Sequence, residues 1–438
     1  MTLKFDRIFW LKSIVVILIL NYMVITIIFN DATVLKYLRD IMLVGILSFS
    51  IIKNKLKLKE TDIIILLFFI MLGVALVNTL ASGGGVGIAI KAIRRYVFPL
   101  GIFLVMSNIG NVDKKRWISF IKFFMIFIGV VSLWGIFQAY VLGDTFLMNL
   151  GYNTGYSYAY QKEMLASSFY FGNLGIQRVV STISNSNVCG LIFGFSFIYL
   201  IMCYSEIKNR YKNIFILIIF AGYILTFSRS NFVALGVIVL WKVWEYMPYK
   251  KWILSIGGFL VLVCMGIAVM QGEDGIIYKL IKWVMESITF KESSAAGRSS
   301  IWLEAIDKII EKPLGNGFGM VGSLAREAGV VNYLHCENSY LALAVDCGIQ
   351  GLIIYMIIFY SLYKRLAERI KLFKSSGNIS YSKICIAGQV LIVYFLIAMF
   401  FSNYIYDMEV VALLYMFIGI GLNLTIDNSI EKNKIENS

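Results

Sequence analysis

The sequence predicts an all-α, polytopic integral membrane protein with about twelve transmembrane helices, and three observations lead to this fold class. Of the 438 residues, 59% are hydrophobic and 15% are charged, whereas a typical soluble domain carries about 25% charged residues. The whole chain contains only three prolines. Apolar runs of about 17 to 25 residues recur along it, and each can cross a bilayer core as a helix. An ordinary soluble domain is therefore excluded.

The apolar runs divide the chain into membrane units separated by two large loops. The predicted spans are residues 8–29, 34–52, 61–80, 88–108, 117–142, 187–204, 212–227, 230–247, 252–270, 338–363, 384–403 and 408–425. The predicted units are a first membrane unit (1–142), a first outer loop (143–186), a second membrane unit (187–270), a second, partly helical outer loop carrying the catalytic motif (271–337), a third membrane unit (338–426) and a polar tail (427–438).

Lysines and arginines concentrate in every second connection between the predicted spans, as the positive-inside rule requires for cytoplasmic loops. They occur at 53–59, 114–116, 208–212, 250–251 and 364–383. This pattern predicts a multi-pass protein with both termini in the cytoplasm and both large loops on the extracytoplasmic side. The net charge of +14 then reflects topology and contact with anionic membrane lipids, so we predict no nucleic-acid binding.

Cysteine and carboxylate spacing predicts neither a metal site nor a cofactor. The six cysteines are Cys189, Cys203, Cys264, Cys336, Cys347 and Cys385. They show no CxxC spacing, so neither a zinc site nor a disulfide framework is indicated. The two outer loops also lack the DxD carboxylate cluster that metal-dependent sugar transfer uses.

An amphipathic helix and a glycine-rich turn are predicted in the second outer loop. Residues 298–311 place apolar side chains along one face and charged side chains along the other, so this helix can lie on a membrane surface. Pro313 and the glycines at 315, 317 and 319 follow. Proline cannot continue a helix interior and glycine tolerates positive φ, so the chain must turn here.

Polar residues come next, directly before the apolar run of span 338–363. His335, the only histidine of the protein, is followed by Glu337, Asn338 and Tyr340. Polar side chains at a membrane boundary are costly unless they are paired or used. A lone histidine is more often structural than catalytic, so both roles stay open for His335 at this point.

Arg178 and Arg229 lie at other boundaries of the predicted outer face. Arg178 precedes span 187–204, and Arg229 lies in TFSRSN, a tight connection between two spans. An ionisable group at membrane depth is expensive and usually functional, and the serines beside Arg229 indicate a prepared polar turn.

Arg94 and Arg95 lie with Lys91 at the outer end of span 88–108, where the positive-inside rule disfavours cations. They either snorkel to lipid headgroups or help to hold an anionic substrate.

The predicted outer face thus gathers arginines from distant segments, including Arg298, beside a histidine and a glutamate. Guanidinium groups bind phosphate oxygens through paired N–H donors and keep their charge. Such a cluster suits a diphosphate and, in place of a metal, would stabilise the charge on a leaving diphosphate. A side chain able to accept a proton would complete an enzyme.

Four motifs occur in the order SRSNFVAL, GRSSIWLEAI, PLGNGFG and HCENSYLALAVDCGIQG. From about Arg178 to Gly351 the chain resembles the O-antigen ligase and Wzy-type polysaccharide polymerase superfamily, while the first five predicted spans agree only in being membrane helices. The resemblance implies a metal-independent, GT-C-type glycosyltransferase of the inner (cytoplasmic) membrane, acting on undecaprenyl-diphosphate-linked sugars at the outer surface.

The resemblance also implies roles for single residues. Arg178, Arg229 and Arg298 would bind the lipid diphosphate. His335 would be the general base, but many relatives carry a histidine directly before the asparagine, where this chain has Glu337. The base is therefore His335, Glu337 or the two together. Asn338 and Tyr340 would orient the base or a sugar.

The expected function is a capsular or exopolysaccharide polymerase that joins lipid-linked repeat units with inversion at the anomeric carbon. One alternative is an O-antigen ligase, which transfers the glycan to another acceptor. A second is a polytopic polysaccharide or small-molecule transporter, although the polar residues gather on one face. The expected partners are the undecaprenyl-diphosphate-linked oligosaccharide and membrane lipids, with a chain-length regulator and a flippase as further candidates.

Overall fold

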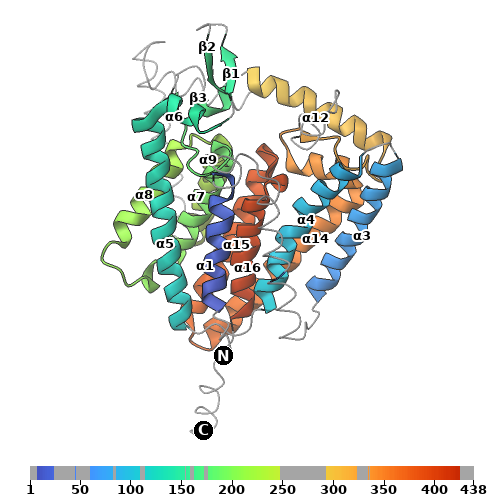
Figure 1. The fold of residues 1–438 in the computed structure, drawn as a ribbon. Coiled ribbons are helices and arrows are strands. Elements are labelled where there is room, and N and C mark those ends of the chain that lie inside the picture. Colours follow the sequence, from blue (N-terminus) through green and yellow to red (C-terminus); the bar gives the residue numbers. More distant parts are fainter. Residues whose placement is uncertain are drawn as a thin grey trace.

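The computed structural model describes residues 7–23, 45, 60–81, 85–108, 114–152, 154–157, 162–171, 176–246, 293–322, 334 and 336–424. His335 and the side chain of Arg298 lie outside this described part. The described residues are mostly helical, and most of the helices run side by side as one bundle (Figure 1). This architecture agrees with the predicted helical membrane protein.

The helices of the bundle follow the predicted apolar runs. They are α1 (Arg7–Asn21), α3 (Glu60–Ala81), α4 (Val86–Asn108), α5 (Lys114–Phe137), α7 (Ser186–Met202), α8 (Lys212–Leu225), α9 (Arg229–Tyr246), α14 (Ser339–Ser375), α15 (Ile379–Phe401) and α16 (Met408–Asn423). Four helical segments of the described part are long and apolar enough to cross a membrane: Ile63–Ala81, Lys114–Asn149, Ser339–Ser375 and Ile379–Phe401. Predicted spans 34–52 and 252–270 lie outside the described residues, apart from Gly45, so the number twelve stays a prediction.

Helix α16 lies in the middle of the bundle, where it packs against α4, α15, α14 and α7 (Figure 1). Every side chain from Val410 to Ile418 is buried, as expected for a helix that is apolar on all sides. Around it, α14 packs along α15 and α3, and α15 packs along α9 and α7. The connection that enters α16 is therefore attached to the best-buried helix of the bundle.

The first predicted outer loop adds two short sheets, which modifies the all-α prediction in detail. After α6 (Gly143–Asn149), β1 (Thr154–Ser157) pairs antiparallel with β2 (Lys162–Leu165), and β3 (Tyr170–Phe171) pairs with β4 (Ile176–Gln177). Tyrosine, threonine and phenylalanine favour extended backbone. The β1–β2 hairpin rises from one end of the bundle (Figure 1), called the hairpin end below.

Helix α12 (Ser293–Glu311) and the turn after it confirm the predicted helix and glycine turn. The glycines at 315, 317 and 319 all have positive φ, of 104°, 87° and 87°. The turn lies against α14, where the Asn316 N–H donates to the Val345 carbonyl at 2.7 Å and the Ile349 N–H donates to the Pro313 carbonyl at 3.0 Å. Helix α14 is kinked beside this turn, at Gly348.

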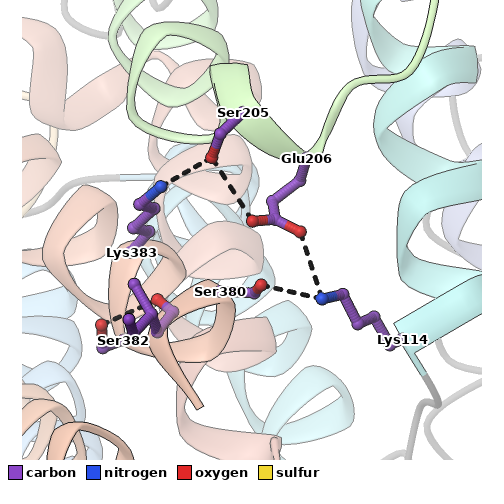
Figure 2. A network of polar contacts seen from close by, with 7 residues as sticks. Lys114, Ser205, Glu206, Ser380, Ser382 and Lys383 are labelled. Carbon is purple, nitrogen blue, oxygen red and sulfur yellow. Dashed lines mark hydrogen bonds and ion pairs between the residues drawn. The ribbon is translucent and has the colours of Figure 1, made fainter. Parts of the chain in front are cut away.

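A polar cluster joins the starts of α5 and α15 to the segment after α7 (Figure 2). The start of α5 lies at the end of the bundle away from the hairpin (Figure 1). Lys114 Nζ lies 3.3 Å from the Glu206 carboxylate and donates to Ser380 Oγ at 2.9 Å. Lys383 Nζ donates to Ser205 Oγ at 2.6 Å, and Ser205 Oγ donates to Glu206 Oε1 at 3.3 Å. Lys114 and Lys383, from two basic segments that the charge pattern assigns to one side of the membrane, therefore lie in one cluster.

Replacing Glu206 by glutamine is expected to lower the free energy of unfolding by less than about 1 kcal/mol at neutral pH, because partly exposed ion pairs contribute little. Burial alone would raise the pKa of Glu206, but hydrogen bonds from Ser380 and Lys114 and the Lys114 charge outweigh it and lower that pKa. A lowered folded-state pKa stabilises the fold above the unfolded-state pKa, and this contribution is lost as the pH falls through the folded-state value.

Denaturant unfolding of the detergent-solubilised protein over a pH series measures this effect. Glu245→Gln, which removes the pair between Lys242 and Glu245 (2.7 Å), is the matched control. A loss of several kcal/mol in E206Q, or a loss that grows as the pH falls through the folded-state pKa of Glu206, would contradict the expectation.

Candidate active site

A cavity of about 770 Å³ lies at the hairpin end of the bundle and is called the polar cavity here. Its lining residues are Tyr22, Gly151, Ser168, Phe169, Arg178, Ser184, Asn185, Ser186, Asn187, Val188, Gly322, Cys336, Glu337, Ser402, Asn403, Tyr404, Tyr406 and Asp407. They come from the first outer loop, the start of α7, the segment before α14 and the connection from α15 to α16. The volume lies within the range of about 300–1,000 Å³ that is usual for ligand sites.

Arg178 is fixed in the wall of the polar cavity by three hydrogen bonds. Nε donates to the Thr226 carbonyl at 2.8 Å, one terminal nitrogen donates to the Ser168 carbonyl at 3.1 Å, and the other donates to Asn187 Oδ1 at 2.6 Å. A guanidinium carries five N–H donors, so these contacts leave two for a ligand. The side chain is thus preorganised at a cavity surface.

Burial and two neighbouring side chains change the pKa of the Arg178 guanidinium. Burial lowers the pKa of its guanidinium to about 10, Tyr404 opposes this decrease, and the positive charge of Arg229 adds to it. Arg178 therefore stays charged at neutral pH. The Arg229 charge therefore lies near enough to act on Arg178, while a shared anion site stays a prediction.

The turn that carries Arg229 is held by a polar network between α7, α9 and the entrance to α16. Asn231 Nδ2 donates to the Asn187 carbonyl at 2.9 Å and to Ser228 Oγ at 2.8 Å. Ser230 Oγ and the Tyr404 hydroxyl form a hydrogen bond of 2.9 Å. The serines beside Arg229 therefore form the polar turn that the sequence indicated.

The segment before α14 contributes Glu337 to the polar cavity. Asn338 does not face the cavity; its Oδ1 accepts hydrogen bonds from the Tyr340 and Leu341 N–H groups at 2.9 and 3.1 Å and so caps α14. The Tyr340 hydroxyl donates to the Leu396 carbonyl at 2.6 Å. These contacts give Asn338 and Tyr340 structural roles, and a part in orienting a base or a sugar stays a prediction.

The connection Ser402–Asp407 is the largest contribution to the cavity that sequence reasoning missed. All of its residues except Ile405 line the cavity, and Ser402 is held through its carbonyl, which accepts a hydrogen bond from Ser339 Oγ at 2.7 Å. The predicted spans 384–403 and 408–425 treat this segment only as a boundary. A signal was present, because SNYIYD places a carboxylate and two tyrosines between two apolar runs.

The buried carboxylate of Asp346 helps to hold the Ser402–Asp407 connection in place. The Tyr406 hydroxyl donates to Asp346 Oδ2 in α14, and the Tyr96 hydroxyl of α4 donates to the same oxygen at 3.5 Å. The Arg95 guanidinium lies over the Tyr406 ring, 5.9 Å from its centre. Arg95 therefore faces the cavity-lining loop. Arg94 does not line the cavity, and the prediction for Arg298 concerns a side chain outside the described part.

A second, apolar groove of about 440 Å³ lies between α9, α14 and α15. It is lined by Val233, Val237, Tyr340, Val393, Leu396, Ile397, Phe400 and Phe401. Phe401 directly precedes Ser402, and Val233 lies one helical turn after Arg229. The groove therefore adjoins the polar cavity at Phe401 and the Arg229 turn at Val233. Trp302 of α12 packs edge-on against Phe400, with ring centres 5.2 Å apart.

Residues 214–356 match the family model described as O-antigen ligase. The match covers less than half of the chain and supports its resemblance to the O-antigen ligase and Wzy-type polymerase superfamily. Members are glycosyltransferase-like enzymes of lipid-linked glycans. The O-antigen ligase match includes Arg229, Arg298, His335 and Glu337. It does not include Arg178 or Ser402–Asp407, which line the polar cavity with Glu337. No curated protein sequence matches the chain.

Proposed function

We propose that this protein is a polysaccharide polymerase of the GT-C type. It joins undecaprenyl-diphosphate-linked oligosaccharide repeat units at the outer face of the cytoplasmic membrane, with inversion at the anomeric carbon and without a metal or other cofactor. The observation that carries the proposal is the polar cavity, which combines the fixed guanidinium of Arg178 and the nearby charge of Arg229 with two carboxylates, Glu337 and Asp407.

The arginines suit the diphosphate of the donor. A guanidinium binds phosphate oxygens through paired donors, and Arg178 keeps two N–H groups beyond those that hold it in place. The charge that develops on the leaving diphosphate would be stabilised by positive groups that need no rearrangement. Arg298 and Arg95 are further candidates for this anion site.

The apolar groove suits the polyprenyl tail of such a donor. Its lining is aliphatic and aromatic apart from the Tyr340 hydroxyl, which is already bonded to Leu396. Because the groove adjoins the Arg229 turn and Ser402, a lipid diphosphate could place its phosphates at the cavity wall and its first isoprene units along α9 and α15. The sugar would then lie in the polar cavity.

The reaction follows from this placement. A hydroxyl oxygen of the acceptor unit attacks the anomeric carbon of the donor, the bond from that carbon to the diphosphate oxygen breaks, and its electron pair leaves with the diphosphate. The hydroxyl proton passes to a base. His335 and Glu337 are the candidates from the sequence, and Asp407 is the carboxylate that the structure adds.

Transfer to a different acceptor is the second candidate function, because the matched family is described as O-antigen ligase. The geometry of the donor side would be the same for both reactions. A transporter is less well supported, since the polar and charged side chains around the described cavity gather at the hairpin end of the bundle.

Purified protein incubated with a lipid-diphosphate-linked repeat unit and a chelator is expected to yield a ladder of products on a gel. The ladder should persist when magnesium replaces the chelator, and it should be absent from heat-inactivated protein. Single transfer to an added second acceptor, without a ladder, would identify a ligase. No transfer under either condition would contradict a glycosyltransferase and return the transporter as the leading function.

A further inference from the structure

Asp407 ends the Ser402–Asp407 connection and occupies the N-cap position of α16. Aspartate at this position commonly accepts a hydrogen bond from the first helical turn, yet the Asp407 side chain makes no such bond. Its backbone carbonyl accepts from the Val410 and Val411 N–H groups instead, at 3.1 and 3.2 Å. Asp407 lines the polar cavity, and its side chain is not used to cap the helix.

The side chains around Asp407 leave its carboxylate able to accept a proton. Among the described residues, no group donates a hydrogen bond to it, and the charges that act on it most are those of Arg95 in α4 and Glu409 in α16. Its neighbour Tyr406 is bonded to Asp346 of α14. Arg178 and Glu337 line the same cavity.

We infer that Asp407 is the catalytic base, the group that removes the proton from the acceptor hydroxyl in the glycosyl transfer. The inference rests on the proposed function and names a residue of its site. The acceptor oxygen forms the new bond to the anomeric carbon, the electron pair of the broken bond leaves on the diphosphate, and the proton moves to the Asp407 carboxylate. Water takes the proton when the product leaves, which restores the base.

Two further properties support this role. Burial, together with the negative charge of Glu409, raises the pKa of Asp407 to about 7, and Arg95 opposes the increase. A general base is most effective when its pKa lies near the working pH. The carboxylate is also well positioned, since its residue begins the buried helix α16 and Tyr406 beside it is tied to α14.

The test compares Asp407→Asn with wild type in the polymerisation assay, using the full chain in lipid nanodiscs. D407N keeps the size of the side chain but cannot accept the proton, so turnover should fall by about 100-fold or more, as is typical for a general base. Binding of undecaprenyl diphosphate, followed by titration, should change less than about threefold, because a base contacts the acceptor and not the donor diphosphate. D407E should recover part of the turnover.

Matched variants separate this role from others. Asp307→Asn makes the same chemical change on the exposed face of α12 and should leave turnover unchanged. His335→Ala and Glu337→Gln, the candidates from the sequence, are measured in parallel. Wild-type turnover should rise with pH and level off above about 7, since only the ionised carboxylate accepts a proton, and D407E should shift that profile.

The outcomes are distinct. If wild type makes no product with any acceptor, the proposed function fails. If wild type is active and D407N keeps at least a tenth of its turnover, or loses donor binding in parallel with turnover, Asp407 is not the base. A D407N defect confined to the KM of the acceptor would also overturn the inference, because it would indicate sugar binding in place of proton transfer.

Discussion

Replacing Arg178 by alanine is expected to abolish polymer formation and to weaken binding of the lipid diphosphate by about 10- to 100-fold, the equivalent of one or two charge-assisted hydrogen bonds. The reason is geometric as well as electrostatic. Three N–H groups of this side chain hold it between Ser168, Thr226 and Asn187, and the remaining two are available at the cavity surface. Titration of purified protein in nanodiscs with undecaprenyl diphosphate measures the binding.

Arg178→Lys separates charge from geometry. A lysine keeps one positive charge but lacks the planar fork, so R178K should bind the diphosphate more weakly than wild type and more tightly than R178A. Arg210→Ala, which removes an exposed arginine in the connection between α7 and α8, is the matched control and should bind normally. Equal binding by R178A and wild type would exclude Arg178 from the diphosphate site.

Loss of folding is the competing explanation for R178A, because the alanine also leaves the Ser168 and Thr226 carbonyls without their donor. A second readout distinguishes the two. The melting temperature of R178A in detergent should be only slightly below that of wild type if Arg178 acts mainly on the ligand. Undecaprenyl diphosphate should raise the melting temperature of wild type but not of R178A.

Apolar run length was sufficient to predict the helices of the described bundle. Spans predicted to begin at 61, 187, 212 and 230 correspond to helices that begin at Glu60, Ser186, Lys212 and Arg229. The predicted C-terminal end of span 338–363 does not match the end of the helix, because α14 continues to Ser375. Residues 364–375 alternate charged and apolar side chains, and a helix can extend past the apolar stretch that crosses a bilayer.

The site was only partly predictable, and the reason is physical. Arg178, Arg229 and Glu337 could be proposed from the sequence because a charged side chain next to an apolar run is costly at membrane depth. Asp407 also sits at such an edge, but its importance depends on the packing of α16 against α4 and α14, which brings Arg95 and Asp346 to its neighbour Tyr406. Contacts between residues so far apart along the chain leave no local pattern in a single sequence.

Replacing Gly348 by alanine is expected to lower the free energy of unfolding by about 3 kcal/mol or more. Gly348 has φ 77° and ψ 173° inside α14, a backbone region that is essentially restricted to glycine. A Cβ at this position would also lie 2.5 Å from the Leu314 carbonyl carbon and 2.6 Å from the Pro313 oxygen. Strain and crowding therefore act together.

The kink links stability to the site. Helix α14 carries Asp346 two residues before Gly348, and the glycine turn after α12 packs directly against it, with the Asn316 and Gly317 N–H groups donating to the Val345 and Asp346 carbonyls at 2.7 and 3.2 Å. Straightening the helix would displace that turn and the carboxylate that holds Tyr406. G348A should consequently lose polymerase activity together with stability.

Two control glycines separate the contributions to the G348A effect. Gly377→Ala tests a similar positive φ of 75° in open space and should cost about 1–2 kcal/mol. Gly236→Ala lies within α9 with no neighbour close to the new Cβ and should be neutral or stabilising by up to about 1 kcal/mol. Denaturant unfolding in detergent ranks the three variants. If G348A unfolded no more easily than G377A, crowding against Pro313 and Leu314 would not destabilise the fold. The turn after α12 would then not depend on the kink in α14.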